Sequence, residues 1–304
     1  MLIFKIISVP YVNKILTIFA KLDIIIQNRK VDDTMVIDFH THVFPDKIAD
    51  RTIETLEANI LKMQGKPKYA VIKGTLDALK QSMKKNNIDY SLVLPIATAL
   101  KQTPTINKYA SAINGKDNIF SFGSLHPSQE DWEEILEGIK ASGLLGIKLH
   151  PEYQEFYVDS PECIRILKKC EELGLYVTFH AGNDHGVAPP VHCSPDRLRR
   201  VLEYVEGDKI IAAHLGGWTD WDNVEKYLVG TPINFDTAYI VDYIDKEQFV
   251  RIVRSHGSEK ILFATDSPWE CQGIGVDFIR NSGLNQEEID NILYKNAQKI
   301  LKLC

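Results

Sequence analysis

Short apolar runs and longer amphipathic stretches alternate along the chain from residue 36 onward. The runs are rich in β-branched and aromatic residues, which is typical of strands, and the stretches between them have helical periodicity. The predicted strands are 36–42, 90–95, 119–125, 145–150, 176–180, 210–214, 233–236 and 261–266. The predicted helices lie near 75–87, 104–116, 129–142, 160–173, 195–206, 219–229 and 245–256, and a last one begins near Asn285.

Eight strand–helix units over residues 35–304 predict one α/β domain, the (β/α)8 TIM barrel, whose usual length is about 250 residues. A doubly wound open sheet is the alternative, and it calls for a glycine-rich phosphate-binding turn after an early strand. The sequence contains no such turn. Residues 43–70 form an insertion after the first strand, and we expect it to be partly helical and close to the functional site.

Residues 1–34 differ from the rest because their many Ile, Leu and Val residues are interrupted by proline and charged residues. No apolar run reaches the roughly 18 residues of a membrane span, and no cleavage site of a signal peptide follows a basic start. Met35 stands directly before the first strand. We therefore interpret Met35 as the native start, with 1–34 arising from an upstream start. The alternative is a genuine N-terminal amphipathic helix that packs on the domain or on a membrane surface.

The composition, 44% hydrophobic and 25% charged, is that of a globular protein able to bury a core. A net charge of −6 provides no basic surface for nucleic acid, so we expect a small-molecule substrate instead. The five cysteines are odd in number and include no C-x-x-C pair, which favours a reducing, cytoplasmic location. The sequence leaves open whether the chain forms homo-oligomers.

His40 and His42 end the first predicted strand. Because strand side chains alternate between faces, the two imidazoles point the same way, a little under about 7 Å apart along the backbone. Neutral imidazole is the commonest metal ligand, so the pair can hold one ion. Asp38 shares this face one step deeper, where it could support a ligand. Solvated or core histidines are the alternative interpretation.

Histidines gather at the carboxyl ends of the predicted strands, where the active sites of this barrel lie. Six of the nine occupy such positions: His40, His42, His126, His150, His180 and His214. Asp266 ends the eighth strand, and closure of a barrel places that strand beside the first. His40, His42 and Asp266 can therefore approach one centre, with His180 across the mouth. Three nitrogens and one carboxylate leave a coordination position open for water, as in a catalytic zinc site.

Four motifs lie on the first, fifth, sixth and eighth predicted strands: Ile37-Asp38-Phe39-His40-Thr41-His42, Thr178-Phe179-His180-Ala181-Gly182, Ala213-His214-Leu215-Gly216-Gly217 and Ala264-Thr265-Asp266-Ser267-Pro268-Trp269. With them, residues 35–304 resemble the amidohydrolase superfamily, specifically the amidohydrolase-related branch of metal-dependent barrel hydrolases and decarboxylases. The resemblance implies that His40, His42, His180 and Asp266 are metal ligands. It implies that His214 is a general acid/base or a ligand of a second metal.

Lys148 and His150 share a face of the fourth predicted strand. In related barrels with two metals, a lysine on this strand is carboxylated and bridges the ions. The alternatives are a cation that holds a substrate carboxylate and a salt-bridged structural lysine. His126, Trp218 and Trp269 are candidates for lining the pocket, although an aromatic side chain at such a place is as often packing.

The residues predict a metal-dependent hydrolase in which a divalent ion activates water for attack on an amide, ester or lactone carbonyl. Asp266 would take the proton of the water, and His214 would assist the proton transfer. Zinc is the first choice, as one or two ions, with manganese and iron tolerated by the same ligands. The enzyme alternative is non-oxidative decarboxylation of an unsaturated or aromatic acid. The alternative from another class is a non-catalytic barrel with a decayed site.

Overall fold

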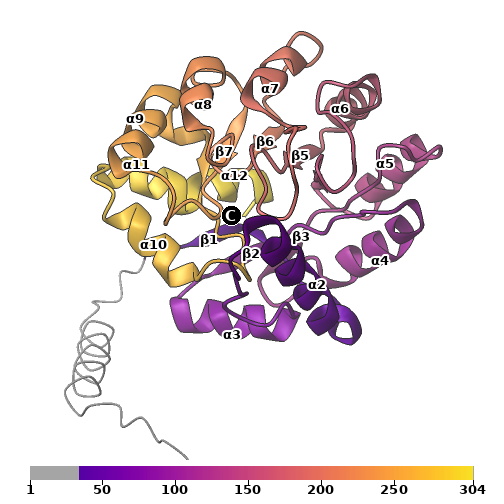
Figure 1. Cartoon of the computed structure of the whole chain (residues 1–304), viewed down its shortest axis with the longest axis horizontal. Helices are drawn as coiled ribbons and strands as arrows, with labels where there is room; N and C mark the ends of the chain where they lie inside the picture. The colour runs from indigo at the N-terminus through magenta and orange to yellow at the C-terminus, as the bar shows by residue number, and fades with distance from the viewer. Residues whose placement is uncertain (1–33, 304) are drawn as a thin grey trace, which may run out of the picture. The chain divides into compact units, whose positions relative to one another are not determined.

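The alternation of strands and helices is present in the computed structural model, which describes residues 34–303 (Figure 1). The strands are β1 Ile37–Thr41, β2 Tyr90–Val93, β3 Ile119–Ser121, β4 Gly146–Leu149, β5 Tyr176–Phe179, β6 Ile210–Ala212, β7 Asn234–Asp236 and β8 Ile261–Leu262. The helices are α2 Asp46–Gln64, α3 Leu76–Asn86, α4 Thr103–Ile113, α5 Trp132–Ala141, α6 Pro161–Leu173, α7 Pro195–Val201, α8 Trp221–Tyr227, α9 Lys246–His256, α10 Gln272–Arg280, α11 Gln286–Asp290 and α12 Asn296–Leu301. The expectations for the N-terminal extension lie outside the described residues.

The strands close into a barrel through two irregular seams. Strands β1 to β3 pair in one parallel sheet and β4 to β8 in another. A parallel bridge between Gly123 and Ile147 joins the first sheet to β4, and a bridge between Thr41 and Ser267 joins the segment after β8 to β1. Helices surround the strands in Figure 1, and Met35–Cys304 forms one compact unit. The prediction of a single (β/α)8 domain is therefore confirmed.

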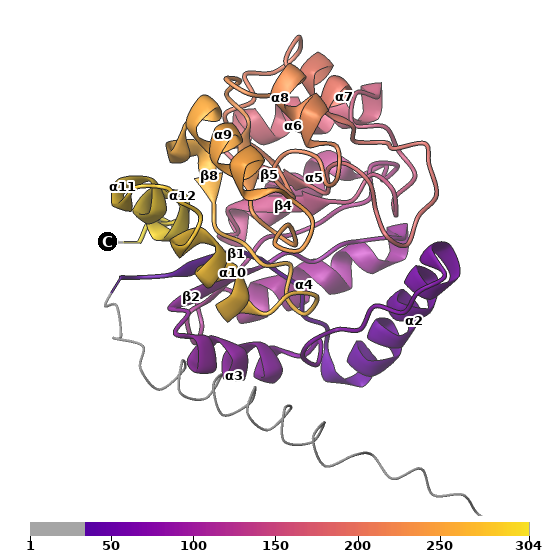
Figure 2. The ribbon, with the colours of Figure 1, turned by 60° about the vertical axis from the view of Figure 1, so that its left-hand side comes forward.

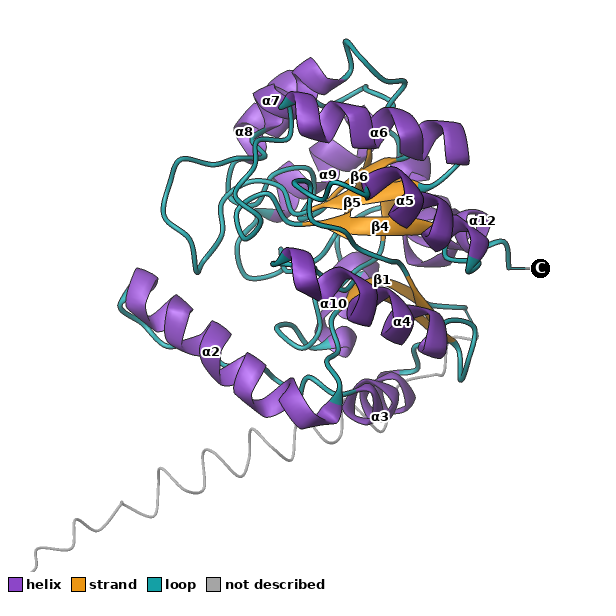
Figure 3. Cartoon of the chain, turned by 90° about the vertical axis from the view of Figure 1, so that its right-hand side faces the viewer, coloured by secondary structure: helices purple, strands orange, loops and turns teal. Residues whose placement is uncertain are grey.

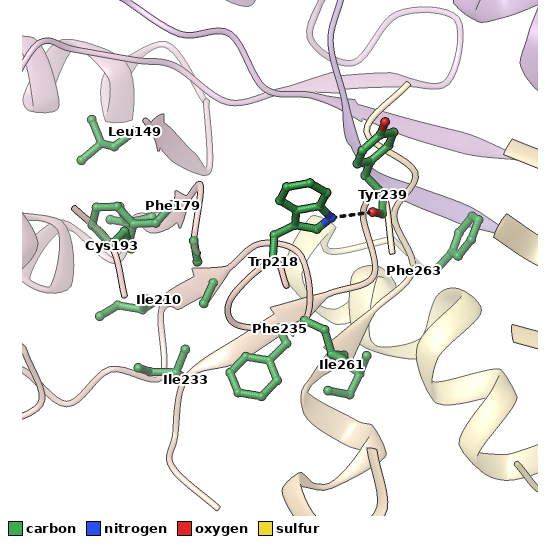
Figure 4. Close-up of a cluster of buried hydrophobic side chains, with 14 of the residues drawn as sticks. Leu149, Phe179, Cys193, Ile210, Trp218, Ile233, Phe235, Tyr239, Ile261 and Phe263 are labelled. Atoms are coloured by element: carbon green, nitrogen blue, oxygen red, sulfur yellow. Dashed lines mark hydrogen bonds between the residues drawn. The ribbon is translucent and has the colours of Figure 1, made fainter. Parts of the chain in front are cut away.

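Apolar side chains from the strands and the surrounding helices form the core. Figure 4 shows part of the larger cluster, in which Phe179, Phe235 and Ile261 are fully buried. A second cluster joins Phe39 of β1 to Ile300 of α12, so the C-terminal helix covers part of the barrel. Each fully buried side chain of this size contributes roughly 1.5–3 kcal/mol to the burial free energy. The apolar runs of the sequence are thus explained by packing.

One helix of the structure is missing from the predicted elements. Helix α10 was not predicted, because Gly273 and Gly275 weaken its helical signal. Both glycines lie against neighbouring side chains, and a Cβ at Gly275 would lie 3.1 Å from Thr265. His256, the last residue of α9, is buried and stacks on Phe235 with ring centroids 4.0 Å apart.

The end of the chain follows its capping signal. Asn285 accepts a hydrogen bond from the backbone N–H of Glu288 (3.0 Å), and the Glu288 carboxylate accepts one from the backbone N–H of Asn285 (2.7 Å). This reciprocal capping box starts α11 at the predicted place. The π-helical turn Asn291–Lys295 then leads into α12.

Helix α2 lies in the insertion after β1, which is partly helical as expected. Figures 2 and 3 show one end of α2 near α3 and the other end beside the long loop that follows β5. Of its 19 residues only Ala49 and Ile60 are buried, and among the described side chains none of α2 belongs to either hydrophobic cluster. The backbone N–H of Phe44 donates to the carbonyl of Gly74 (2.8 Å) and closes the base of the insertion. We call residues 45–73 the flap.

Gly182 is the tightest point of the fold next to the candidate site. It pairs with Trp218, its φ is +86°, and an added Cβ would overlap the backbone nitrogen of Trp218. We expect Gly182→Ala to lower the free energy of unfolding by about 3 kcal/mol or more, since both the dihedral and the space forbid a side chain. Urea denaturation measures the loss.

Gly143→Ala is the matched control, because Gly143 has a φ of +81° but no heavy atom within 4 Å of the added Cβ. We expect it to cost only about 1 kcal/mol, the penalty of the dihedral alone. Equal losses for the two variants would contradict the close approach at Gly182.

Candidate metal centre

His40 and His42 lie at the end of β1 with their hydrogen positions fixed by acceptors behind them. His40 Nδ1 lies 2.8 Å from Oδ2 of Asp236, and His42 Nδ1 lies 2.8 Å from the carbonyl oxygen of Leu94. A carbonyl or carboxylate oxygen accepts only, so each Nδ1 carries the hydrogen and donates. Each Nε2 therefore has a lone pair, and the two Nε2 atoms are 3.1 Å apart.

Asp266 completes this group. Its Oδ1 lies 3.0 Å from His42 Nε2 and 3.4 Å from His40 Nε2. All three ligand atoms lie within 4.8 Å of one another. Two lone pairs and a carboxylate that face one another favour a cation between them, and the three donors suit a divalent metal.

A second imidazole pair is formed by His180, which follows β5, and His214, which follows β6. His180 Nε2 lies 3.0 Å from the carbonyl oxygen of Asn183, and His214 Nδ1 lies 2.9 Å from that of Ala238. Those nitrogens carry the hydrogens, so the lone pairs of His180 Nδ1 and His214 Nε2 face each other at 2.9 Å. A shared proton or a metal ion can fill this position.

The surroundings disfavour a proton at the second pair. Burial, together with the charges of neighbouring groups, lowers the pKa of His180 to about 3 and that of His214 to about 4. Both imidazoles are therefore neutral at neutral pH, and their facing lone pairs favour a metal ion.

Lys148 of β4 lies beside His40 and is 1% exposed. Its Nζ is 3.3 Å from His40 Nε2, and its charge also lowers the pKa values of His180 and His214. Burial lowers the pKa of Lys148 itself to about 8. No carboxylate oxygen within residues 34–303 lies within 4 Å of Nζ, so the structure gives no support to a salt-bridged structural role.

His150, predicted beside Lys148, belongs to a third group with His180 and Asp184. His150 Nδ1 accepts a hydrogen bond from the backbone N–H of Tyr153 (3.3 Å), so Nε2 carries the hydrogen and faces Asp184 Oδ2 at 3.5 Å. The N–H group of His180 Nε2 also faces this oxygen, at 3.7 Å. Here the N–H groups of two imidazoles face a carboxylate oxygen, so the hydrogen-bonding groups are satisfied without a metal. It orients His180 from behind.

Sequence reasoning missed Asp236 and Asp184, and it named no partner for Asp38. Asp236 ends β7, so the positional argument applied to the histidines would have found it. It holds His40 through Oδ2 and accepts the backbone N–H of His214 through Oδ1 (2.9 Å). Asp38 does not contact an imidazole. Its carboxylate accepts hydrogen bonds from the hydroxyl and backbone N–H of Thr265 (2.6 and 3.1 Å), which aligns the Asp266 segment with β1.

Three residues around the centre have left-handed backbone dihedrals, His214 at φ +59°, Tyr239 at +55° and Asp266 at +58°. Such conformations are costly for residues with side chains and tend to occur at functional sites. Two of the three, His214 and Asp266, are candidate site residues.

The predicted pocket residues have different surroundings. Trp218 is buried and donates from Nε1 to the carbonyl oxygen of Tyr239 (3.2 Å; Figure 4). Trp269 packs against the larger hydrophobic cluster. His126 is half-buried in the turn after β3, where Nδ1 accepts a hydrogen bond from the backbone N–H of Ser128 (3.3 Å). In the described part of the chain, no hydrogen bond or ring contact joins His126 to the other site histidines.

Solved structures share this fold. The chain resembles 5-carboxyvanillate decarboxylase from Sphingomonas paucimobilis, with 13% identity, 90% of this chain and 100% of that chain covered, and a TM-score of 0.65. It resembles 2,6-dihydroxybenzoate decarboxylase from Rhizobium, with 14% identity, 89% and 99% covered, and a TM-score of 0.65. It also resembles 5-carboxyvanillate decarboxylase from Novosphingobium aromaticivorans, a structure with bound manganese, with 13% identity, 90% and 99% covered, and a TM-score of 0.65.

At these identities the likeness shows the fold. No curated protein sequence matches the chain. In the described part of the molecule, none of the helices has the length and apolar character that crossing a membrane requires. The amidohydrolase family model matches residues 37–303, which include β1 to β8 and every side chain of the candidate metal centre. The chain therefore belongs to the amidohydrolase family.

Proposed function

We propose that the protein is a metal-dependent hydrolase that cleaves an amide, ester or lactone of a small molecule. The observation that carries this proposal is that unprotonated ligand atoms face one another within two groups at the barrel rim. The first group is His40, His42 and Asp266, and the second is His180 and His214. A divalent metal, zinc by the nature of the donors, would be held by His40, His42 and Asp266. A second ion would be held by His180 and His214.

Metal held at these positions would polarise a carbonyl group and activate water for attack on it. Asp266 lies beside both β1 histidines through Oδ1, and its second oxygen would take the proton of the attacking water. Asp236 and the carbonyl of Ala238 hold His40 and His214 in fixed orientations. The chain thus fixes the geometry before substrate binds.

Lys148 supports two ions only after its charge changes. An ammonium 3.3 Å from His40 Nε2 would be repelled by a cation on that nitrogen. Its lowered pKa makes the neutral amine accessible, and that amine can attack carbon dioxide, form a new N–C bond and release a proton. The resulting carbamate is an anion that can bridge the two metal positions. We therefore propose that Lys148 is carboxylated in the active enzyme.

Decarboxylation of an unsaturated or aromatic acid is the second candidate. It is favoured by the absence of any carboxylate partner of Lys148 within residues 34–303, because an ammonium there could hold the carboxylate of a substrate. The similar folds of characterised decarboxylases agree with it. In this case the centre would hold one ion and Lys148 would remain a cation.

Metal counting tests the state of Lys148. We expect protein prepared with zinc and bicarbonate to hold about two ions per chain, and Lys148→Met to hold about one, since the bridging anion is lost while the side-chain volume is kept. Inductively coupled plasma mass spectrometry gives the count. One ion in the wild-type protein, unchanged by bicarbonate, would contradict the carboxylated lysine and support the second candidate.

The assignment of ligands is tested by two alanine variants. We expect His180→Ala to lose the second ion and keep the first, and His40→Ala to lose the first, because the lone pairs of these residues face different partners. Metal content after dialysis measures both. If His180→Ala lost all metal, His180 would share the ion of His40, His42 and Asp266, as the family resemblance implies.

The reaction itself is tested by a panel of amides, esters and lactones, followed by acid release, and by a panel of unsaturated and aromatic acids, followed by carbon dioxide release. We expect hydrolysis, and we expect His214→Ala to lose about 100-fold or more of the turnover. Carbon dioxide release without hydrolysis would replace the first candidate by the second. A His214→Ala variant with normal turnover would contradict the role of His214.

A further inference from the structure

Lys68, in the flap between α2 and α3, presents a half-buried positive charge to aromatic rings. Its Nζ lies 5.0 Å from the centroid of Tyr239 and 5.9 Å from that of Tyr243. No carboxylate oxygen of residues 34–303 lies within 4 Å of this nitrogen. The ring faces are therefore the charge-stabilising contacts that the described chain offers to Lys68.

The rings belong to a cluster of four side chains, His185, Trp218, Tyr239 and Tyr243, which we call the aromatic cluster. The Tyr239 and Tyr243 hydroxyls are 3.2 Å apart, and His185 Nε2 lies 3.1 Å from the Tyr243 hydroxyl. Trp218 packs on His185 with ring centroids 4.2 Å apart. His185 Nδ1 is buried and has no hydrogen-bond partner among the described residues. A polar atom is thus left unsatisfied beside the cation.

The aromatic cluster adjoins the metal centre through the backbone. His185 directly follows Asp184, whose carboxylate faces His180. Tyr239 directly follows Ala238, whose carbonyl accepts a hydrogen bond from His214. Burial, the Tyr243 hydroxyl and the charge of Asp266 together raise the pKa of Tyr239. The aromatic cluster and Lys68 therefore lie next to the loops that hold His180 and His214 in place.

The flap that carries Lys68 is held by polar contacts. Gln64 Nε2 donates to the carbonyl of His185 (3.1 Å), and the backbone N–H of Val71 donates to the carbonyl of Pro268 (2.7 Å), two residues from Asp266. These bonds fix both ends of the segment that contains Lys68. The lysine is placed over the aromatic cluster by the fold rather than by chance.

We propose that Lys68 binds a carboxylate of the substrate at a position apart from the reacting carbonyl, which makes Lys68 a residue that determines specificity for anionic substrates. This inference rests on the proposed function, since it assigns the class of substrate for the same centre. An ammonium pairs more strongly with a carboxylate than with a ring face when water is partly excluded.

Calorimetric titration with benzoate tests the proposal, with benzamide as the neutral analogue. The full chain is used with zinc and also without metal, so that binding by Lys68 is separated from binding by the metal. We expect Lys68→Gln to bind benzoate about tenfold more weakly than the wild-type protein and Lys68→Arg to retain the affinity. Benzamide should bind all variants equally and weakly.

Lys66→Gln is the matched control, because Lys66 is an exposed lysine of the same segment, and we expect it to bind benzoate like the wild-type protein. Equal benzoate affinity of the wild-type protein and Lys68→Gln, or no measurable benzoate binding, would overturn the proposal. The metal-free arm needs neither bound metal nor turnover, so its failure is distinct from a failure of the proposed hydrolase.

Discussion

The candidate centre depends on hydrogen bonds made behind the imidazoles. Leu94, Asn183 and Ala238 each present a backbone carbonyl to one ring nitrogen, and Asp236 presents a carboxylate to a fourth imidazole. These acceptors place every N–H group away from the centre, so the lone pairs meet in front. An arrangement in which acceptors face acceptors is unfavourable without a cation, and its formation by the fold is the physical reason to expect metal.

Barrel closure brings these acceptors and ligands together. The bridge between Thr41 and Ser267 sets Asp266 beside β1, and Asp38 strengthens that seam through Thr265. Asp236 then connects β7 to both imidazole pairs, since one oxygen holds His40 and the other holds the backbone of His214. Residues more than two hundred positions apart thus share one small volume, and the core packing around them resists any loosening of their geometry.

The sequence predicted the barrel and most side chains of the centre because apolar periodicity and strand-end histidines are local signals. The sequence could not show which ligands share a metal ion. Whether His180 faces His42 or His214 depends on the orientation of its ring, which the carbonyl of Asn183 sets. Sequence reasoning missed α10, whose glycines fit close contacts that only the folded chain contains. Lys68 gave no signal at all, because its surroundings come from loops after β5, β6 and β7.

Nitrogen-15 NMR of the histidine rings in the metal-free protein is the most direct measurement of this account. We expect the hydrogen to lie on Nδ1 in His40, His42 and His214, and on Nε2 in His180. Addition of zinc should shift the opposite nitrogen of each ring, the one with the lone pair. Rapidly exchanging tautomers in the metal-free protein, or a hydrogen on Nδ1 of His180, would contradict the converging lone pairs and the metal centre built on them.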